Sequence, residues 1–513
     1  MSQYQKVNPY LSAAHYSLTA FDSQQSDSFP FPVPAGRFDV DLLTLPRVIG
    51  GPVNITCLAS AREDRMWAMA TDRMTLVDVA DGRFTPLAAM RYPGIDPIAD
   101  DSLIELAARK FSSVEEASGL AHQLFGEHPE LRTSNGLYTV ADCDDVIYVN
   151  VGSTIHAISM ADPDDPSAGL KVLRSLDTTT IFTPYAFPGY PAAVKLIGMN
   201  LTYDGHLVIG AFGQICVVDR EFARPAAVYN FAEGQLLSNS FAVDDNGGIY
   251  VATGSLAPGA PGLMHKLVWT GNQISASEAD GGWVCEYPGG NWAPAVKVGT
   301  GTGSTPTVMG FDEGEDRLVV MTDGRDRMHL TAFWRDEVPA DASRLAHAIP
   351  VTCGLSDDVA WIQSEQSVAT IDGGALVVNN VTASGQDDRL IDVLVSGPLT
   401  EPARGVERFQ WSNEKHEWES VWTRNDLASI SQVPVLSYAS GMALVNTYGD
   451  DGWEVTGVDW ATGQTVHRTV FGNVTAGNGA YALVQFLADG DMIFTSVTGP
   501  VRVPLSQLAP EPL

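Results

Sequence analysis

Residues 195–219 read KLIGMNLTYDGHLVIGAFGQICVVD, and this stretch shows the unit from which most of the chain is built. Its order is strand, turn, strand, tight turn, strand. The apolar runs are short and rich in β-branched residues, and the first turn is Asp204-Gly205, a pair typical of two-residue hairpins in which the backbone needs a positive φ. The stretch therefore predicts a small antiparallel sheet.

The same order returns along the chain. Further copies begin at Asn54, Asn135, Asn239, Ser304, Ser367, Val433 and Ala480. The copies repeat at roughly 40 to 60 residues, a period typical of propeller blades. A sandwich would not need eight near-equivalent units, and a parallel solenoid would have a shorter and stricter period. We therefore predict an all-β fold, an eight-bladed β-propeller.

The two ends of the chain are predicted to close the ring. The last copy supplies about three strands before Leu513, whereas residues 36–45, GRFDVDLLTL, form a strand-like run with no blade of its own. Pairing this run with the C-terminal blade would remove two exposed sheet edges. We expect residues 36–513 to form a single propeller domain and residues 1–35 to form an N-terminal tail that packs on it.

Two segments interrupt the pattern. Residues 96–131 are rich in Ala, Leu and Glu with apolar residues three and four apart, which predicts a helical insertion between the first two blades. It could present a solvated face or cap the funnel. Residues 299–303 are glycine-rich like a phosphate-binding loop, but Pro306 and a β-type run follow, not the Lys-Ser/Thr and helix of a P-loop. The glycines are predicted to let the chain cross tightly between blades.

The composition of the chain limits the classes of partner that we expect it to bind. The chain has 30 basic and 62 acidic residues, a net charge of −32, and no basic run, so neither nucleic acid nor an anionic membrane surface is a predicted partner. No apolar stretch suits a signal peptide or a membrane span, which predicts a cytoplasmic location. The five cysteines are scattered and odd in number, which predicts buried thiols. The sequence predicts no oligomeric state.

Polar residues near the starts of the innermost strands are the candidate ligand-binding residues. In a propeller these starts lie around one mouth of the central channel. The candidates are Asn54, Tyr138, Asn200, Asn239, Ser304, Thr305 and Gln366. Such a ring suits a small polar ligand, although the same groups could cap strand ends or hold channel water.

The catalytic candidates are Glu365, His15 and Asp22. Glu365 lies beside this ring and could act as a general base or a cation ligand. His15, in the tail, could reach the same site with Asp22 or Asp27 as its orienting partner; disorder or simple surface packing of the tail is the alternative. No zinc-type spacing, HExxH, G-x-S-x-G or EF-hand motif is present, so no metal site is predicted.

Residues Asp459-Trp460-Ala461-Thr462-Gly463 resemble the inter-blade motif A-x-D-x-x-T-G-x-x-x-W of the quinoprotein-dehydrogenase-like propellers, an eight-bladed superfamily. Gly457 replaces the Ala of that motif and His467 its docking Trp. In dehydrogenases of the family, pyrroloquinoline quinone often sits beside a disulfide of adjacent cysteines, above a calcium held partly by Glu and Asn. This chain has no adjacent cysteines, so calcium and the quinone are unsupported by its motifs.

Three functions follow as hypotheses. The leading one is an enzyme that binds a small organic molecule in the funnel and carries out acid-base chemistry, such as hydration, elimination, isomerisation or hydrolysis, with Glu365 or His15 moving the proton. The first alternative is a noncatalytic scaffold that binds a ligand or a protein. The second is a quinone- or metal-dependent oxidoreductase. The fold alone does not choose among them.

Overall fold

The structure is a computed structural model that describes residues 6–53, 55–96, 98–126, 138–187, 190–237, 239–291, 299–382, 389–430 and 432–513. Within these residues the chain forms eight sheets of three or more strands, which we number in chain order. Apart from two N-terminal strands described below, their neighbouring strands are antiparallel and mostly follow one another in sequence. The sequence prediction of a mostly β protein built from small antiparallel sheets is confirmed.

The strands of the first four sheets are as follows. The first sheet contains β3 (Thr56–Ala59), β4 (Arg65–Met69), β5 (Arg73–Asp78) and β6 (Thr85–Arg91). The second contains β7 (Val140–Ala141), β8 (Ile147–Val151), β9 (Thr154–Met160) and β10 (Leu170–Asp177). The third contains β13 (Leu196–Leu201), β14 (His206–Ala211), β15 (Gln214–Asp219) and β16 (Ala227–Asn230). The fourth contains β17 (Gln235–Leu237), β18 (Ala242–Val243), β19 (Gly248–Ser255), β20 (Gly262–Trp269), β21 (Ile274–Ser275) and β22 (Trp283–Tyr287).

The strands of the last four sheets follow. The fifth sheet contains β23 (Thr307–Met309), β24 (Leu318–Thr322), β25 (His329–Trp334) and β26 (Leu345–Pro350). The sixth contains β27 (Ala369–Ile371), β28 (Gly374–Val378), β29 (Val406–Ser412) and β30 (Glu417–Arg424). The seventh contains β31 (Val435–Ser437), β32 (Met442–Gly449), β33 (Gly452–Asp459) and β34 (Thr465–Gly472), and the eighth β35 (Val484–Phe486), β36 (Met492–Ser496) and β37 (Gly499–Val503). A separate hairpin, β11 (Tyr185–Phe187) and β12 (Tyr190–Ala193), lies between the second and third sheets in sequence.

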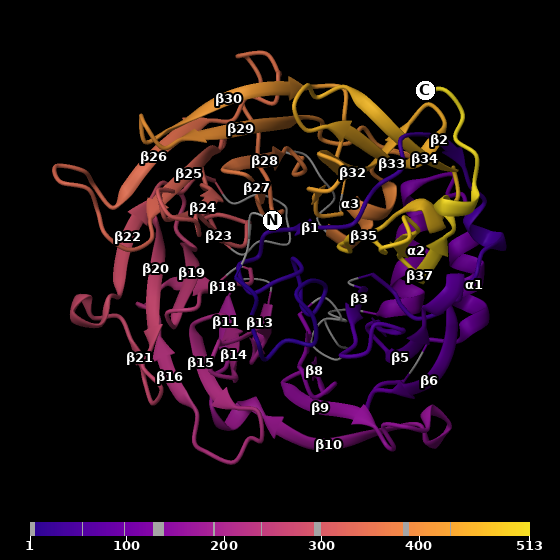
Figure 1. Cartoon of the computed structure of the whole chain (residues 1–513), viewed down its shortest axis with the longest axis horizontal. Helices are drawn as coiled ribbons and strands as arrows, with labels where there is room; N and C mark the ends of the chain where they lie inside the picture. Colours follow the sequence, from indigo (N-terminus) through magenta and orange to yellow (C-terminus); the bar gives the residue numbers. More distant parts are fainter. Residues whose placement is uncertain are drawn as a thin grey trace.

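The sheets stand radially around a common axis (Figure 1). The first strands, such as β3, β13, β18, β23, β27 and β35, face the centre, and the last strands, such as β6, β10, β16, β26 and β30, lie outside. We call the end of the channel at which the innermost strands begin the leading end, and the end at which they finish the trailing end. The N-terminal segment lies in the centre of the ring (Figure 1).

One buried aspartate explains why the repeat can be recognised from the sequence. Asp244 Oδ1 accepts hydrogen bonds from the main-chain N–H groups of Asn246 (2.9 Å) and Gly248 (2.8 Å), and its Oδ2 accepts one from the Tyr250 hydroxyl (2.6 Å). Asp142 makes the equivalent set of bonds in the second sheet. Each carboxylate thus satisfies the turn between the first two strands and ties it to the second strand.

Tryptophans join neighbouring sheets. The Trp67 indole N–H donates to Asp145 Oδ1 of the next sheet (2.9 Å), and that of Trp411 donates to Asp316 Oδ2 of the preceding sheet (2.8 Å). Each ring packs its apolar body between two sheets while its single donor is satisfied at the turn of the neighbour.

The N-terminal strands close the ring differently from the prediction. Strand β2 (Gly36–Asp39) pairs in parallel with β34 of the seventh sheet, not with the C-terminal blade. Strand β1 (Ser28–Phe29) pairs in parallel with β31, so both ends of that sheet are covered by the N-terminal region. Residues 46–53 lie beside β37 instead, where Val48 N donates to Pro500 O (3.0 Å) and Gly50 N to Thr498 O (3.2 Å). The strand predicted to join the last sheet therefore joins the sheet before it.

Three helices pack beside the eighth sheet. Helices α1 (Asp100–Ala108) and α2 (Val114–Phe125) lie within residues 96–131, and α3 (Arg389–Val395) follows β28. Their apolar residues form one buried cluster with Ala480 and Val497 (Figure 1). The Ser113 hydroxyl caps α2 by accepting from Glu116 N (3.2 Å). Each described helix is too short and too polar to cross a lipid bilayer.

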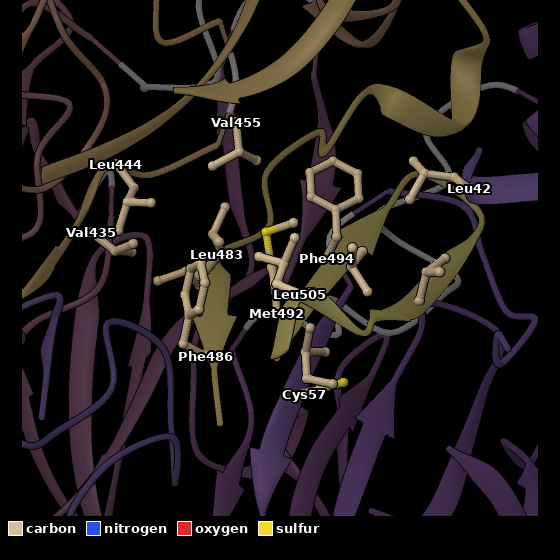
Figure 2. Close-up of a cluster of buried hydrophobic side chains, with 14 of the residues drawn as sticks. Leu42, Cys57, Val435, Leu444, Val455, Leu483, Phe486, Met492, Phe494 and Leu505 are labelled. Carbon is tan, nitrogen blue, oxygen red and sulfur yellow. The ribbon is translucent and has the colours of Figure 1, made fainter. Parts of the chain in front are cut away.

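The largest apolar cluster joins the first, seventh and eighth sheets to the N-terminal segment. Phe486, Met492 and Phe494 of the eighth sheet pack there with Cys57 of the first and Val435 of the seventh (Figure 2). Tyr16, Phe21 and Phe29 of the N-terminal segment belong to the same cluster. This core makes the N-terminal segment part of the folded body.

Candidate functional site

A hydrogen-bonded network at the leading end brings four of the sheets together. Tyr138 precedes β7, Asn239 precedes β18, and Glu365 precedes β27. The Tyr138 hydroxyl donates to Asn239 Oδ1 (2.6 Å), and Asn239 Nδ2 donates to the carbonyl oxygens of Gly303 (2.7 Å) and Glu365 (3.3 Å). Residues near the starts of the innermost strands of the second, fourth, fifth and sixth sheets are thus linked through one asparagine.

Ser304 and Gln366 extend this network toward the seventh sheet. The Ser304 hydroxyl donates to Gln366 O (2.7 Å) and lies 2.6 Å from the Thr322 hydroxyl. The Ser429 hydroxyl donates to Gln366 Oε1 (3.0 Å) and to Gln432 O (2.9 Å). Thr305 is buried beside Ser304.

Two buried amides of this group have unsatisfied atoms among the described residues. Gln366 Nε2 has no hydrogen-bond partner there, and neither Nε2 nor Oε1 of Gln432 has one. Both side chains are almost fully buried, Gln366 at 4% exposure and Gln432 at 0%. Buried polar groups are normally paired with protein, water or a ligand, so these amides mark a place where a polar group belongs.

Tyr138 and Glu365 interact electrostatically. Burial raises the pKa of Tyr138 well above its usual value, and the negative charge of Glu365 raises it further. Tyr138 therefore keeps its proton at neutral pH and acts as a hydrogen-bond donor. Glu365 itself is 8% exposed, and its main-chain N–H donates to Asn380 Oδ1 (3.0 Å).

Asn200 lies elsewhere. It is fully buried within β13, where its Nδ2 donates to Ser23 O (3.2 Å) and Phe241 O (3.1 Å) and its Oδ1 accepts from Leu201 N (2.8 Å). It thereby holds the N-terminal segment near the trailing end. Asn54 lies outside the described residues.

His15 and Asp22 also lie with the N-terminal segment. His15 Nε2 is 3.2 Å from the Tyr438 hydroxyl, just past the end of β31. Burial lowers the pKa of His15 to about 4, although a main-chain bond with Ser28 opposes this, so its ring is neutral at pH 7. Asp22 Oδ1 accepts from Gln24 N (2.9 Å), and its other oxygen accepts from the Ser26 hydroxyl.

The structure thus divides the sequence-predicted residues between two places. Tyr138, Asn239, Ser304, Thr305, Glu365 and Gln366 gather at the leading end. His15 lies beside Tyr438 just past the end of β31, Asn200 lies near the end of β13, and the hydrogen bonds described for Asp22 stay within the N-terminal segment; none of these bonds reaches Glu365. His15 and Glu365 are therefore not brought into one site.

The N-terminal segment itself is the feature that sequence reasoning missed. Residues 16–29 are buried without interruption, and their carbonyl oxygens accept hydrogen bonds from main-chain N–H groups of innermost strands. The bonds run from Ala59 to Tyr16, Ala141 to Ser17, Val243 to Ser23, Val308 to Gln24, Thr370 to Ser26 and Leu436 to Asp27. The Tyr16 hydroxyl adds a bond to Phe486 O (3.1 Å). Each innermost strand except β13 bonds to this segment through its main chain. Strand β13 is joined to it through the side chains of Asn200 and Asn8.

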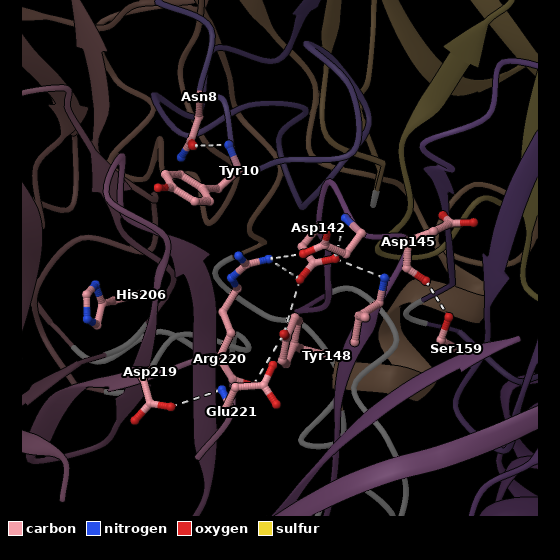
Figure 3. Close-up of polar contacts among 12 residues, drawn as sticks. Asn8, Tyr10, Asp142, Asp145, Tyr148, Ser159, His206, Asp219, Arg220 and Glu221 are labelled. Atoms are coloured by element: carbon pink, nitrogen blue, oxygen red, sulfur yellow. Dashed lines mark hydrogen bonds and ion pairs between the residues drawn. The ribbon is translucent and has the colours of Figure 1, made fainter. Parts of the chain in front are cut away.

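The residues before this segment are anchored at the trailing end (Figure 3). Asn8 Nδ2 donates to Leu201 O (2.8 Å), and the Arg220 guanidinium lies 5.2 Å from the centre of the Tyr10 ring. Arg220 also donates to Asp142 Oδ2 (2.6 Å), the turn carboxylate of the second sheet (Figure 3). A small cavity lined by Phe311, Asp312 and Asp372 opens near the turns of the fifth and sixth sheets, away from Glu365.

The residues present do not fit the quinone arrangement of the family that the sequence resembles. Cys57, Cys216 and Cys353 are buried free thiols, as expected, but Cys143 is exposed and Cys285 half-buried, and no two cysteines are adjacent. Within the described ranges no three His, Cys, Asp or Glu side chains are grouped to hold a metal. We therefore derive no chemical step through that cofactor.

Comparisons with known proteins support the fold. No protein-family model matches the chain. An uncharacterized protein of Archaeoglobus fulgidus is 31% identical over 337 residues, which are 62% of this chain and 63% of that protein. This chain thus matches less than two thirds of the length of that relative.

A solved structure resembles nearly the whole chain in shape. Quinohemoprotein alcohol dehydrogenase from Comamonas testosteroni matches with a TM-score of 0.51 and 11% identity, over 96% of this chain and 77% of that one. The dihydro-heme d1 dehydrogenase NirN matches with a TM-score of 0.42 and 11% identity, over 90% and 75% of the two chains. The chain therefore has a β-propeller fold, and the predicted fold-level resemblance to quinoprotein-type propellers is confirmed. At such identity the likeness concerns the fold alone.

Proposed function

We propose that residues 36–513 form one eight-bladed propeller that binds a small polar molecule at the leading end of its channel. The eight sheets and their radial arrangement support the blade count. The observation that carries the binding proposal is the network centred on Asn239, whose side chain bonds to the Tyr138 hydroxyl and to main-chain carbonyl oxygens just before the fifth and sixth sheets. The unsatisfied amides of Gln366 and Gln432 lie beside it and supply both donors and an acceptor.

The proposal is tested by looking for the bound molecule. Native mass spectrometry of the freshly purified full chain should show a retained small molecule or, if it is lost on purification, a thermal shift with fractions of a cell extract. Asn239→Ala should reduce the retained fraction or the shift at least tenfold, because it removes both the acceptor for Tyr138 and the donor that holds two carbonyl groups.

The matched control is Asn272→Ala, in an exposed hairpin turn, which should leave binding unchanged. The proposal fails if no molecule binds, or if binding is the same in wild type and Asn239→Ala while both variants remain folded by circular dichroism.

A second candidate, an acid-base enzyme at the same place, is favoured by the interaction between Glu365 and Tyr138. A carboxylate whose charge reaches a protonated tyrosine offers a base and a donor side by side. Once a substrate is found, Glu365→Gln should lower kcat at least a hundredfold with KM changed little. Equal turnover in the variant would leave binding as the function.

A further inference from the structure

The N-terminal segment, residues 16–29, is held in the ring mostly by hydrogen bonds. Nine of the fourteen residues 16–29 are polar and buried: Ser17, Thr19, Asp22, Ser23, Gln24, Gln25, Ser26, Asp27 and Ser28. The apolar anchors are Tyr16, Leu18, Ala20, Phe21 and Phe29. The rings of Phe21 and Phe29 lie 6.0 Å apart, and Phe29 stacks on Phe486 at 5.7 Å. Water can replace most of these hydrogen bonds when the segment leaves the channel, so each bond adds little net free energy to the docking of the segment.

The backbone of the segment is also strained. Tyr16, Ala20, Phe21, Gln25 and Asp27 all have φ between 53° and 77°, a region that residues other than glycine rarely adopt. Gln25 Oε1 and Asp27 Oδ1 are buried with no hydrogen-bond partner among the described residues. The surrounding strands hold this conformation in place, and an extended tail would not retain it.

Two buried acids lie in the segment. Asp27 Oδ2 accepts from the Ser367 hydroxyl (2.6 Å), and the Asp22 carboxylate accepts from Ser26. Burial raises the pKa of Asp22 to about 7 and that of Asp27 well above its usual value, and the charge of Asp22 raises the pKa of Asp27 further. The seated segment therefore holds protons that a solvated segment would release.

None of the ionisable groups described around Asp22 and Asp27 is a cation in contact with either carboxylate. Tyr203, in the turn of the third sheet, interacts electrostatically with Asp22 and also with Asp244 and Asp245 of the fourth sheet, of which Asp245 pairs with Lys6 at 3.7 Å. On the seventh-sheet side lie Tyr438 and the neutral His15, and Glu365 lies two residues before Ser367. Among these groups the acids and phenols outnumber the single lysine, so ionisation of Asp22 and Asp27 adds negative charge to an acidic neighbourhood.

We propose that residues 16–29 form a releasable plug, which closes the trailing end of the channel and leaves it, with the sheets intact, when Asp22 and Asp27 ionise. In the closed state the segment lies in the centre of the ring, and its carbonyl oxygens accept hydrogen bonds from the main chain of the innermost strands. Release exposes these N–H groups and opens the centre of the ring. The direction of the pH effect follows from the number of protons bound in each state. The segment is held most strongly below the ordinary aspartate pKa, and its attachment weakens as pH rises toward and past 7.

Hydrogen exchange of the full chain tests the plug. Amide exchange, corrected for the intrinsic pH dependence, is measured at pH 5.5 and 8.5 for residues 16–29 and for β32 as an internal reference. In wild type the protection of residues 16–29 relative to β32 should fall at least tenfold between the two pH values. In Asp22→Asn/Asp27→Asn it should change less than twofold, and the exposed control Asp101→Asn should behave as wild type.

A second measurement needs no variant. A fluorescent peptide with the sequence of residues 8–29 but carrying Asp22→Asn and Asp27→Asn, so that it cannot ionise at these positions, is added to the wild-type chain, and its capture is followed by anisotropy. Capture at pH 8.5 and none at pH 5.5 is expected, because only the vacated seat can accept it. Constant protection of residues 16–29, loss of protection together with β32, an unchanged pH response in the double variant, or no capture at pH 8.5 would each overturn the proposal. These readouts involve no ligand at the leading end, so the proposed function stands or fails separately.

Discussion

Asp244 shows how much a single residue contributes to a repeat. Its carboxylate accepts two main-chain N–H bonds and a tyrosine hydroxyl, and Asp142 does the same in the second sheet. In the third sheet Thr202 takes this place, with its hydroxyl accepting from His206 N (2.8 Å). The chemistry is local, which is why the turns could be predicted from sequence.

Asp244→Ala should therefore lower the free energy of unfolding by about 2–4 kcal/mol, because two buried N–H groups and the Tyr250 hydroxyl lose their acceptor. Denaturant unfolding of the purified variant measures the loss. Asp245→Ala, at the exposed neighbouring position, should cost less than about 0.5 kcal/mol. Equal losses in the two variants would show that the turn bonds are not important for stability.

His15 should make stability depend on pH in the acid range. Its pKa in the folded protein, about 4, lies below the ordinary value of 6.5, so the folded state disfavours the proton. The contribution of the neutral ring is complete above pH 6.5 and is lost as pH falls through 6.5 toward 4, by up to about 3 kcal/mol. His15→Gln should flatten this part of the stability profile, measured by urea unfolding at pH 4 to 7. An unchanged slope would place His15 in solvent.

At the scale of elements, the sheets were predictable and the N-terminal segment was not. Strands such as β14 and β19 follow alternating or β-branched patterns with Gly and Asp at the turns, signals that sequence carries directly. The N-terminal segment instead binds through carbonyl oxygens, which every residue has, and it turns at Tyr16, Ala20 and Phe21, residue types that do not mark turns.

The candidate site was predictable to the same degree. Tyr138, Asn239 and Glu365 follow from counting back along regular strands, and the structure links them. Placing His15 beside Glu365 required the path of the tail, which depends on tertiary contacts with distant strands. For the same reason the partner of residues 36–39 was misplaced by one sheet, because a strand pattern does not specify which edge it joins.

Phe29 should anchor the N-terminal segment to the eighth sheet. It is fully buried and stacks on Phe486, so Phe29→Ala should weaken this docking by about 3–5 kcal/mol. The expected result is cleavage within residues 6–35 by a protease at concentrations that leave the sheets intact. Phe31→Ala, at a half-buried position, is the control and should cleave more slowly. Equal resistance of Phe29→Ala and wild type would contradict the docking.

For the whole molecule, Arg502 links the last sheet to the first. Its guanidinium is 2% exposed, pairs with Asp491 (2.8 Å) and Asp489 (2.6 Å), and donates to the carbonyl oxygens of Val79 (2.7 Å) and Arg83 (2.8 Å). It therefore ties β37 to the segment that follows β5 and helps to close the ring.

Arg502→Ala should cost about 3–5 kcal/mol, because it leaves the buried Asp491 carboxylate without its cation and separates the two sheets. Thermal unfolding should then show a lower midpoint, with the first and eighth sheets losing amide protection before the fourth. Arg83→Ala, which removes an exposed ion pair with Asp78, is the control and should cost less than about 1 kcal/mol. Uniform loss of protection around the ring would mean that Arg502 is not the closing contact.

The central claim is that the ring of sheets is threaded by its own N-terminal segment, whose carbonyl oxygens satisfy the innermost strands. Hydrogen exchange resolved to single amides at pH 5.5 tests it most directly at Ala59, Ala141, Val243, Thr370 and Leu436, whose N–H groups donate to that segment. The account predicts that all five exchange as slowly as amides of the second strands, such as Val149 and Leu376. Exchange of these five at the rate of amides facing open water, with the second strands still protected, would contradict it.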